Sequence, residues 1–495
     1  MRRFHGHRFS ASRWRAGLGV CLLACAAGIG NAAVTLPKIF GDGLVLQRER
    51  PVPVWGRATA GAEITVRFAG QQKQAKADGD GHWRVNLDSL PASSQPQELT
   101  IAGDGSVTLH NVLVGEVWLC SGQSNMEMAV GVASAGAQPE SAHDPALAQQ
   151  IKTASYPALR LFRVEKKRQP PDVVSDGWQD CRGDALAHFS AAGFFFGREL
   201  SQTLGVPVGL IESAWGGSRI EEWTPADAYE KLEPILGEDA ARTFERDPSM
   251  VGHNYEAMVR PLAPFALRGV LWYQGESQII AYNDGLRYAD KMQALVASWR
   301  AAWGQPDLPF YSVQLAPFLY TQRKDKLPHA ADELPKLWEA QIRSTAIPHT
   351  GIVPITDTVD DPANIHPGKK SVVGHRLAAL ALADTYHREN VVSAGPVFAR
   401  LEIQGASAIV HFRGADLGLV TRDGKALNEF EIAGRDGTFV PAQATIRGDT
   451  VVVTSRQVSR PTAVRFGWRE TAQPSLMNRE GWPAYPFRSN GPAWP

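Results

Sequence analysis

Four short segments of the sequence together carry the residue types that acyl transfer requires. A serine hydroxyl is a poor nucleophile until a neighbouring base accepts its proton, and the tetrahedral intermediate then needs hydrogen-bond donors at its oxyanion. The sequence supplies a serine, a pair of glycines, an amide side chain and a histidine for these tasks. The four segments are Ser121-Gly122-Gln123-Ser124-Asn125-Met126, Ala214-Trp215-Gly216-Gly217-Ser218, Gln274-Gly275-Glu276-Ser277 and Asn364-Ile365-His366-Pro367.

Three hydrogen-bond donors are expected for the oxyanion: the backbone N–H groups of Ser124 and Gly217, and the side-chain amide of Gln274. Glycine lets the backbone approach a ligand closely, since no Cβ stands in the way. The serine segment does not follow the G-x-S-x-G pattern of the α/β-hydrolase elbow. Each segment alone is weak evidence, because serine and glycine are common in ordinary turns. Their combination at the strand ends of one sheet is what indicates a site.

The elements that must position these segments alternate between apolar strands and amphipathic helices. Strands are expected at 112–120, 158–164, 207–213, 268–275, 308–316 and 351–357, and helices at 191–204, 288–303, 335–346 and 369–387. This alternation predicts an α/β domain with a doubly wound, mostly parallel sheet that is covered on both faces. In such sheets, functional residues collect after the carboxyl ends of the strands, where all four segments fall.

The two ends of the chain have a different texture. Short strand-like runs with alternating apolar residues are separated there by Gly, Pro and Asp clusters, a pattern typical of small β-sandwich-like domains. We therefore expect four parts: a leader over 1–33, an N-terminal β domain over 34–110, a catalytic α/β domain over 111–390 and a C-terminal β domain over 391–495.

The first 33 residues have the three-part pattern of a secretory signal peptide. A stretch with five arginines and no acid precedes an apolar run over 16–30, and small residues follow, so cleavage is expected after Ala32 or Ala33. We expect export to the periplasm or the medium, because the apolar run is too short for a membrane anchor. Cys25 completes a lipoprotein-like box, which keeps lipid anchoring open as a variant of export. Cys120 and Cys181 stay in the mature chain, either paired or as buried thiols.

The composition of the 495-residue chain is that of an ordinary globular protein, with 44% hydrophobic and 21% charged residues. Removing the leader leaves 46 basic against 51 acidic residues, and no lysine- or arginine-rich block is present, so no nucleic-acid partner is expected. No other stretch is long and apolar enough to span a membrane. The sequence lacks a cysteine–histidine cluster with the spacing of metal ligands, and neither a metal nor a cofactor is expected. Its oligomeric state is not indicated.

The segments resemble, in this order along the chain, the sialate O-acetylesterase family of the SGNH hydrolases. The resemblance is carried by GEVWLCSGQSNMEM, SAWGGSRIEEW, GVLWYQGESQ, NIHPGKKSVVGHRLA and the tail LMNREGWPAYPFRSN. It implies a flavodoxin-like catalytic sheet flanked by β domains, no metal, and deacetylation of carbohydrate. At the matching positions it implies Ser124 as the nucleophile, His366 as its base, and an oxyanion hole formed by Ser124, Gly217 and Gln274.

The chain departs from that family in front of the histidine. An aspartate is usual three residues before the histidine, or two in many close relatives, whereas this chain has Ala363 and Asn364 there. Asp361 is the nearest acid, and it would reach the imidazole of His366 if the intervening residues fold back as a tight turn. Alternatively, Asn364 or a backbone carbonyl holds the imidazole, and the site is a Ser–His dyad.

Three residues beside the four segments are candidates for substrate binding: Trp215, Arg219 and Glu276. Sugars present C–H faces that pack on aromatic rings, so Trp215 offers a platform. Glu276 is alternatively expected to be a buried hydrogen-bond organiser of the serine loop. Trp272 and Tyr273 lie within a predicted strand, and we expect them in the core.

We therefore expect an exported serine esterase that removes O-acetyl groups from carbohydrates through an acyl-enzyme. Its substrates would be sialic acids or acetylated plant hemicellulose oligosaccharides. Two alternatives stay open: an esterase acting on non-sugar acyl substrates, and a non-catalytic carbohydrate-binding protein. The intact set of serine, glycine, glutamine and histidine argues against the second alternative.

Overall fold

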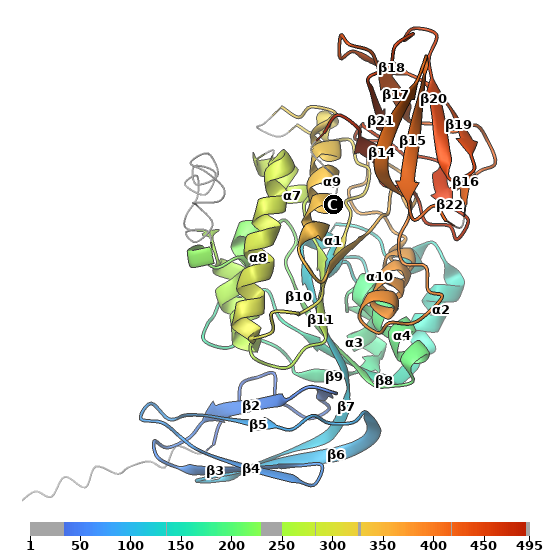
Figure 1. Cartoon of the computed structure of the whole chain (residues 1–495). Helices are drawn as coiled ribbons and strands as arrows, with labels where there is room; N and C mark the ends of the chain where they lie inside the picture. Colours follow the sequence, from blue (N-terminus) through green and yellow to red (C-terminus); the bar gives the residue numbers. More distant parts are fainter. Residues whose placement is uncertain are drawn as a thin grey trace, which may run out of the picture.

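The computed structural model describes residues 34–134, 136–228, 250–282, 284–324, 328–416 and 418–491. The predicted signal peptide, residues 1–33, lies outside the described residues, so its cleavage stays a prediction. The described chain forms a central α/β part with a β-rich unit at each end (Figure 1). Among the described residues, none of the helices combines the length and the apolar character that crossing a bilayer requires.

The central sheet is mostly parallel and has the strand order β13–β12–β11–β7–β10–β8–β9. Its strands are β7 (Ser106–Gly122), β8 (Ser155–Arg163), β9 (Trp178–Arg182), β10 (Val208–Ala214), β11 (Gly269–Tyr273), β12 (Phe310–Val313) and β13 (Thr350–Val353). Neighbouring strands are parallel except at the edge, where β9 runs antiparallel to β8. The register places Gly122, the last residue of β7, opposite both Ala214 in β10 and Tyr273 in β11. The carboxyl ends of three strands therefore meet at one end of the sheet.

Helices cover both faces of this sheet (Figure 1). On one face α4 (Ala191–Leu204) packs against α10 (Lys370–Asp384), and α8 (Tyr288–Trp303) with α9 (Glu333–Arg343) lies on the other. Ser190 caps α4 by accepting a 3.1 Å hydrogen bond from the Gly193 N–H, and Gly205 ends this helix with a φ of +67°. The shorter helices are α1 (Ser124–Glu127), α2 (Pro145–Thr153), α3 (Gly183–Ala187) and α7 (Glu276–Tyr282). The predicted α/β architecture with a mostly parallel sheet is confirmed.

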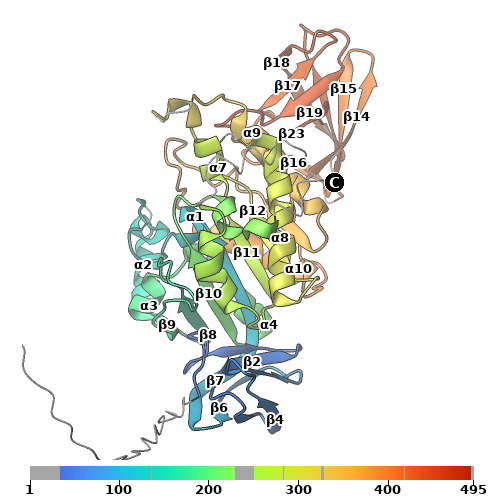
Figure 2. The ribbon, with the colours of Figure 1, turned by 90° about the vertical axis from the view of Figure 1, so that its left-hand side faces the viewer.

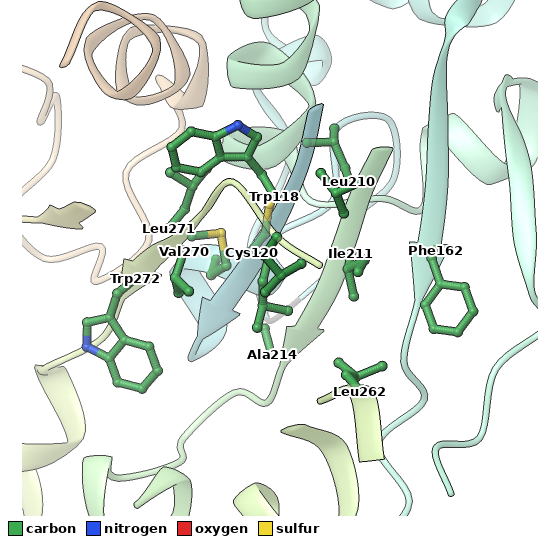
Figure 3. Close-up of a cluster of buried hydrophobic side chains, with 14 of the residues drawn as sticks. Trp118, Cys120, Phe162, Leu210, Ile211, Ala214, Leu262, Val270, Leu271 and Trp272 are labelled. Atoms are coloured by element: carbon green, nitrogen blue, oxygen red, sulfur yellow. The ribbon is translucent and has the colours of Figure 1, made fainter. Parts of the chain in front are cut away.

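The core of the α/β part is formed by the apolar side chains of its central strands. Figure 3 shows Trp118 and Cys120 from β7 beside residues of β10 and β11, all of them buried. Cys120 and Cys181 are both free and buried. Of the two alternatives, a disulfide or two buried thiols, the structure therefore has the buried thiols. Burial raises the pKa of the Cys181 thiol to about 12, which keeps it protonated.

The N-terminal unit is continuous with the central sheet through β7. The first part of this strand pairs with β1 (Val45–Gln47) and β6 (Ser93–Ala102), and its second part pairs with β10 and β11. The expected domain boundary between residues 110 and 111 thus falls inside a single strand. The remaining strands are β3 (Glu63–Phe68) and β4 (Gln71–Lys76) in the same sheet, and β2 (Val52–Arg57) paired with β5 (His82–Leu87) in a separate antiparallel ladder.

The C-terminal unit holds two four-stranded sheets around a core of its own (Figure 2). The first sheet has the order β14–β15–β20–β19 and the second β18–β17–β21–β23, and β16 pairs with β22 beside them. Their bounds are β14 (Val397–Gln404), β15 (Ser407–Arg413), β16 (Leu419–Thr421), β17 (Phe430–Ala433), β18 (Phe439–Pro441), β19 (Gln443–Arg447), β20 (Thr450–Thr454), β21 (Ala463–Phe466), β22 (Leu476–Asn478) and β23 (Phe487–Arg488). Figure 2 shows this unit and the N-terminal unit at opposite ends of the α/β part.

Candidate active site

The hydroxyl of Ser124 and the imidazole of His366 lie in hydrogen-bond contact. The distance from Ser124 Oγ to His366 Nε2 is 2.8 Å, although 242 positions separate the two residues along the chain. Ser124 begins α1 directly after β7, and His366 lies in the loop between β13 and α10. This geometry suits proton transfer from a nucleophile to its base. The structure therefore brings the two predicted residues together.

The turn that presents Ser124 depends on Gly122. Gly122 has a φ of +136°, and a Cβ at this position would lie 2.2 Å from the carbonyl oxygen of Tyr273. That carbonyl accepts a 3.0 Å hydrogen bond from the Gln123 N–H, and the Gly122 carbonyl accepts one of 3.1 Å from the Trp215 N–H. Since both contacts need the close approach of the three strand ends, only glycine suits this position. The turn fixes Ser124 against the ends of β10 and β11.

The Gly216–Gly217 turn after β10 lies beside Ser124. A carboxylate oxygen of Glu127 accepts a 2.6 Å hydrogen bond from the Gly216 N–H, and the other oxygen accepts one of 2.6 Å from Lys166 Nζ. Gly217 is exposed with a φ of +76°. Neither the Ser124 N–H nor the Gly217 N–H donates to another residue in the part of the chain that the structure describes. Both predicted backbone donors are therefore available to a ligand.

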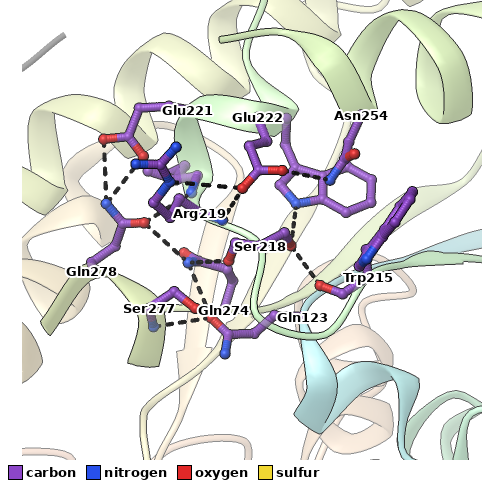
Figure 4. A network of polar contacts seen from close by, with 12 residues as sticks. Gln123, Trp215, Ser218, Arg219, Glu221, Glu222, Asn254, Gln274, Ser277 and Gln278 are labelled. Atoms are coloured by element: carbon purple, nitrogen blue, oxygen red, sulfur yellow. Dashed lines mark hydrogen bonds and ion pairs between the residues drawn. The ribbon is translucent and has the colours of Figure 1, made fainter. Parts of the chain in front are cut away.

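The side chain of Gln274 was predicted to donate to the oxyanion, but in the structure its amide faces acceptors of the protein (Figure 4). Its amide nitrogen lies within hydrogen-bond distance of three acceptors: Gln123 Oε1 at 3.1 Å, the Ser218 carbonyl at 3.3 Å and Gln278 Oε1 at 3.3 Å. Its amide oxygen accepts a 2.9 Å hydrogen bond from the Tyr288 hydroxyl. An amide has only two N–H donors, so an oxyanion would have to displace one of these acceptors.

Gln123 is a site residue that the sequence analysis did not single out. Its side-chain oxygen accepts from the Gln274 amide and also from the backbone N–H groups of Gly275 and Ser277, both at 3.3 Å (Figure 4). The side chain thus ties the serine turn to the start of α7. Its position directly before Ser124 was the available signal, but the partners of a glutamine in a turn depend on tertiary contacts.

Asp361 does not contact His366. Its carboxylate accepts a 2.8 Å hydrogen bond from the Ala363 N–H, which closes a local turn, and the side chain is exposed. Asn364 accepts a 3.0 Å hydrogen bond from the backbone N–H of His366 and donates its own N–H to the Asp361 carbonyl at 3.0 Å. The residues before His366 do fold back as a turn. Within this turn, however, the Asp361 carboxylate bonds to a backbone N–H and not to the imidazole. In this structure the Asp361 carboxylate therefore makes no hydrogen bond to the His366 imidazole.

The two other acids that precede His366 are also engaged elsewhere. Asp360 accepts a 2.6 Å bond from Lys369 Nζ at the surface. Asp357 forms a bidentate pair with Arg376, with both N–O distances at 2.7 Å. Among the described residues, none of the three aspartates before His366 bonds to its imidazole.

Burial and a neighbouring cation keep the His366 imidazole neutral. Burial, followed by the positive charge of Lys370, lowers its pKa to about 4, and the carboxylate of Glu127 opposes both effects. A neutral imidazole accepts a proton, so above this pKa His366 is in the state that a general base requires.

The three predicted substrate-binding residues occupy different environments. Trp215 is half-buried beside the Gly216–Gly217 turn, and the guanidinium of Arg168 stacks on its ring at 4.6 Å from the centroid. Arg219 is largely buried, and its backbone N–H donates to Glu222 at 3.1 Å (Figure 4). Glu276 is 3% exposed and faces the protein interior. Trp215 and Arg219 are thus both partly exposed, whereas Glu276 is buried.

Two other predicted placements can be compared directly with the structure. Trp272 and Tyr273 are fully buried in β11, as expected for core residues.

A cavity of about 390 Å³ lies next to the site, lined by Glu127, Ser134, Arg163, Lys166, Glu212 and Ala214 among others.

A surface turn in the N-terminal unit gathers Asp78, Asp80 and His82. All three are exposed, and the Asp78 carboxylate accepts the backbone N–H groups of the other two at 3.0 and 2.8 Å. This hydrogen bonding is that of a tight turn between β4 and β5. The turn lies in a different part of the molecule from Ser124 (Figure 1).

Comparison with known proteins agrees with this geometry. The family described as carbohydrate esterase, sialic acid-specific acetylesterase, matches residues 114–383. The chain is 28% identical to the sialate O-acetylesterase of Rattus norvegicus, covering 91% of this chain and 93% of that protein. It is 30% identical to the sialate O-acetylesterase of Homo sapiens, covering 76% and 75%. The crystal structure of a carbohydrate acetylesterase from Xanthomonas citri matches with a TM-score of 0.81 and 38% identity, covering 92% of this chain and 99% of that one. The chain therefore belongs to the carbohydrate esterase family of sialic acid-specific acetylesterases.

Proposed function

We propose that this protein is a serine esterase that removes O-acetyl groups from carbohydrates through an acyl-enzyme. The observation that carries the proposal is the 2.8 Å contact between Ser124 Oγ and His366 Nε2 at the carboxyl end of a parallel sheet. Family membership supports the carbohydrate ester as the substrate class. The strand order β10–β7–β11–β12–β13 supports a flavodoxin-like sheet of the SGNH type, flanked by β-sandwich-like units.

Apart from the ester and water, the proposed reaction uses only groups of the protein. His366 Nε2 accepts the hydroxyl proton of Ser124 while Oγ bonds to the acetyl carbonyl carbon, and the carbonyl electrons move onto the oxygen. When the tetrahedral intermediate collapses, the bond to the sugar oxygen breaks and His366 returns the proton to that oxygen. Water then attacks the acetyl-serine in the same way, with His366 as its base, and acetate leaves. No cofactor enters these steps.

The oxyanion is stabilised by the backbone N–H groups of Ser124 and Gly217. Both are free of protein acceptors among the described residues, and the Gly216–Gly217 turn is held in place by Glu127. Gln274 adds a third donor if one of its three present acceptors yields to the oxyanion. Removal of one such donor from an oxyanion hole typically costs about 10²–10³ in kcat.

The sugar lies on the side of the Gly216–Gly217 turn that carries Trp215. Arg168, which covers one part of this ring, is itself held by Asn254 Oδ1 at 3.0 Å and Glu222 Oε2 at 2.7 Å. A rigid, half-buried indole suits the C–H face of a pyranose. Acetylated sialic acids and acetylated plant hemicellulose oligosaccharides are the two substrate groups that we propose to compare.

The leader pattern supports export of the mature chain to the periplasm or the medium. Sequencing of the N-terminus of the secreted or periplasmic protein tests this directly. A mature start at Ala33 or Val34 agrees with export by signal cleavage, whereas an intact Met1 in the cytosolic fraction contradicts it.

The function is tested by measuring acetate release from acetylated sialosides, xylo-oligosaccharides and xyloglucan fragments. Wild type is expected to release acetate from at least one member of this panel, and Ser124→Ala from none. A short-chain ester without a sugar serves as the comparison. If wild type cleaves the sugar-free ester and none of the acetylated carbohydrates, the carbohydrate substrate is wrong and the serine mechanism stands.

A further inference from the structure

A buried lysine lies four residues after His366. Lys370 is only 1% exposed and is the first residue of α10. Lysine is almost never fully buried unless it is paired, because desolvation of an ammonium group is costly. The positive end of the helix dipole at this terminus also disfavours a cation. A position with two such costs calls for a compensating role.

The contacts of Lys370 lead to both sides of His366. Its Nζ donates to the carbonyl of Pro367 at 2.7 Å and to Asn125 Oδ1 at 2.7 Å. The amide nitrogen of Asn125 donates in turn to the carbonyl of Ile365 at 3.1 Å. The two peptide carbonyls that flank His366 are therefore held by one connected set of side chains, which also includes the residue next to the nucleophile.

Glu276, the first residue of α7, also belongs to this set of contacts. One of its carboxylate oxygens accepts a 2.5 Å hydrogen bond from the Asn125 amide, and the other has no partner among the described residues. Asn125 thus has each of its polar hydrogens donated and its oxygen engaged, so its amide orientation is fixed by Glu276 and Lys370. The sequence alternative of Glu276 as an organiser of the serine loop agrees with these contacts.

We propose that Lys370, acting through Asn125 and Glu276, is the positioning residue that takes over the task of the absent carboxylate behind His366. This inference rests on the proposed function of Ser124 and His366. A catalytic aspartate ordinarily orients the imidazole by bonding to its ring. Here Lys370 and Asn125 instead hold the backbone carbonyls of the residues before and after His366. Asn125 also connects these contacts to the serine turn.

The charges around the imidazole provide a readout of the influence of Lys370 on His366. Lys370 and Glu127 are the charged groups that act on His366, and they act in opposite directions. Burial lowers the pKa of Lys370 to about 7, opposed by Glu276 and Glu140, and burial raises the pKa of the Glu276 carboxyl. Removal of Lys370 takes away a cation near the imidazole, so the pKa of His366 rises. This rise shows only that the ammonium acts on the imidazole, and a loss of kcat without a change in KM reports whether Lys370 positions the ring.

The test uses Lys370→Met, with Lys369→Met as the matched control. Lys369 is the adjacent lysine, and its ammonium pairs with Asp360 at the surface at 2.6 Å. The double variant Lys370→Met/Glu276→Gln removes both buried charges, so we expect it to fold even if the single variant is destabilised by its uncompensated carboxylate. Each protein is assayed for kcat and KM on an activated acetyl ester, for the acid limb of its pH profile, and by histidine-selective NMR titration.

For Lys370→Met and the double variant we expect kcat to fall by about 10²-fold, the scale of an ångström-level misplacement. KM should change little, the acid limb should move to higher pH, and Lys369→Met should match wild type. The NMR titration, with the His366 signal assigned by its loss in His366→Ala, should show the same upward movement. A kcat within about twofold of wild type in a folded variant overturns the inference, whether or not the His366 titration moves. Failure of the proposed function would look different: wild type itself would hydrolyse no ester, whereas failure of this inference alone would leave Lys370→Met as active as wild type.

Discussion

His366 contacts Ser124 at 2.8 Å, while the three aspartates that precede it in sequence bond to other partners. The carboxylate of Asp361 closes a turn with the Ala363 N–H, and Asn364 accepts the N–H of His366 itself. At the scale of single residues, these contacts favour a Ser–His dyad whose histidine is held through its backbone. Of the two alternatives that the sequence left open, we therefore propose the dyad in place of a triad with Asp361.

The dyad predicts a small effect for Asp361→Asn. We expect kcat to fall less than about fivefold, whereas neutralising an essential triad carboxylate costs about 10⁴. His366→Ala is the comparison that should be nearly inactive. Steady-state kinetics on an activated acetyl ester measure both. A loss of about 10³ or more for Asp361→Asn, in a variant with unchanged thermal unfolding, would restore the triad.

The buried imidazole predicts an unusual pH profile. The pKa of His366 is lowered to about 4 by burial and by Lys370, and the base is active in its neutral form. Activity should therefore appear as pH rises through about 4 and be nearly flat between about pH 5.5 and 7.5, where an unperturbed histidine would still titrate. The dependence of kcat/KM on pH reports this group in the free enzyme. An acid-limb midpoint near 6.5 would contradict the assigned environment.

Residue types and their spacing were enough to predict that Ser124 and His366 lie together, because a nucleophile and a base must be side chains of particular chemistry. Lys370 and Asn125 were not predicted as a pair. They lie 245 positions apart, and a lysine at the start of a helix is an ordinary surface residue by pattern alone. Gln274 was predicted to face the oxyanion, but its three acceptors lie in the interior of the protein.

At the scale of elements, the site exists because three parallel strands end at the same level. Gly122, Ala214 and Tyr273 are register partners, so the segments that follow β7, β10 and β11 must meet. The loop after β13 brings His366 to the same place. Because all four segments follow strand ends of one sheet, the sequence pattern alone indicates the site.

The serine turn predicts a steep cost for a side chain at position 122. In Gly122→Ala the new Cβ would lie 2.2 Å from the Tyr273 carbonyl oxygen, so β7 and β11 would have to separate. Gly205→Ala is the matched control, because Gly205 also has a positive φ but open space around it. Gly205→Ala should lower the free energy of unfolding by about 1–2 kcal/mol, and Gly122→Ala should lower it clearly more. Urea unfolding of both variants measures the difference, and equal values would contradict the role given to the close approach.

The helices α4 and α8 begin and end where the sequence predicted, at 191–204 and 288–303. Their apolar spacing is periodic, and Gly205 and Gly304 mark their ends in the left-handed conformation. Strand β4 was not predicted. Its sequence QQKQAK carries no apolar alternation, and it is held in the sheet by pairing with β3 and not by burial of its own side chains.

At the scale of the whole molecule, the β units are joined to the α/β part in different ways. The N-terminal unit shares the strand β7 with the central sheet, and no sequence signal interrupts this strand at the expected boundary. The C-terminal unit has its own core, but its last loop returns to the main one. Trp482 belongs to the main core and lies under the guanidinium of Arg376, at 5.5 Å from the ring centroid.

This packing predicts that the C-terminal loop stabilises the α/β part. Trp482→Ala should lower the free energy of unfolding by about 3–5 kcal/mol, the usual cost of removing a buried tryptophan. Arg376 would lose its aromatic neighbour but keep the bidentate pair with Asp357. Chemical unfolding monitored together with esterase activity measures the effect. A change below about 1 kcal/mol would mean that the C-terminal unit is an independent appendage.

The most direct test of the account is to trap the acetyl-enzyme. Wild type is mixed with an activated acetyl ester, quenched in acid within the first turnover and digested, and the peptides are analysed by mass spectrometry. We predict one acetyl group on the peptide that contains Ser124, located on Ser124 by fragmentation, and no such adduct in Ser124→Ala, which should have lost about 10⁶ in rate. Turnover by wild type without this adduct, together with a folded Ser124→Ala variant that retains activity within tenfold, would contradict the serine mechanism.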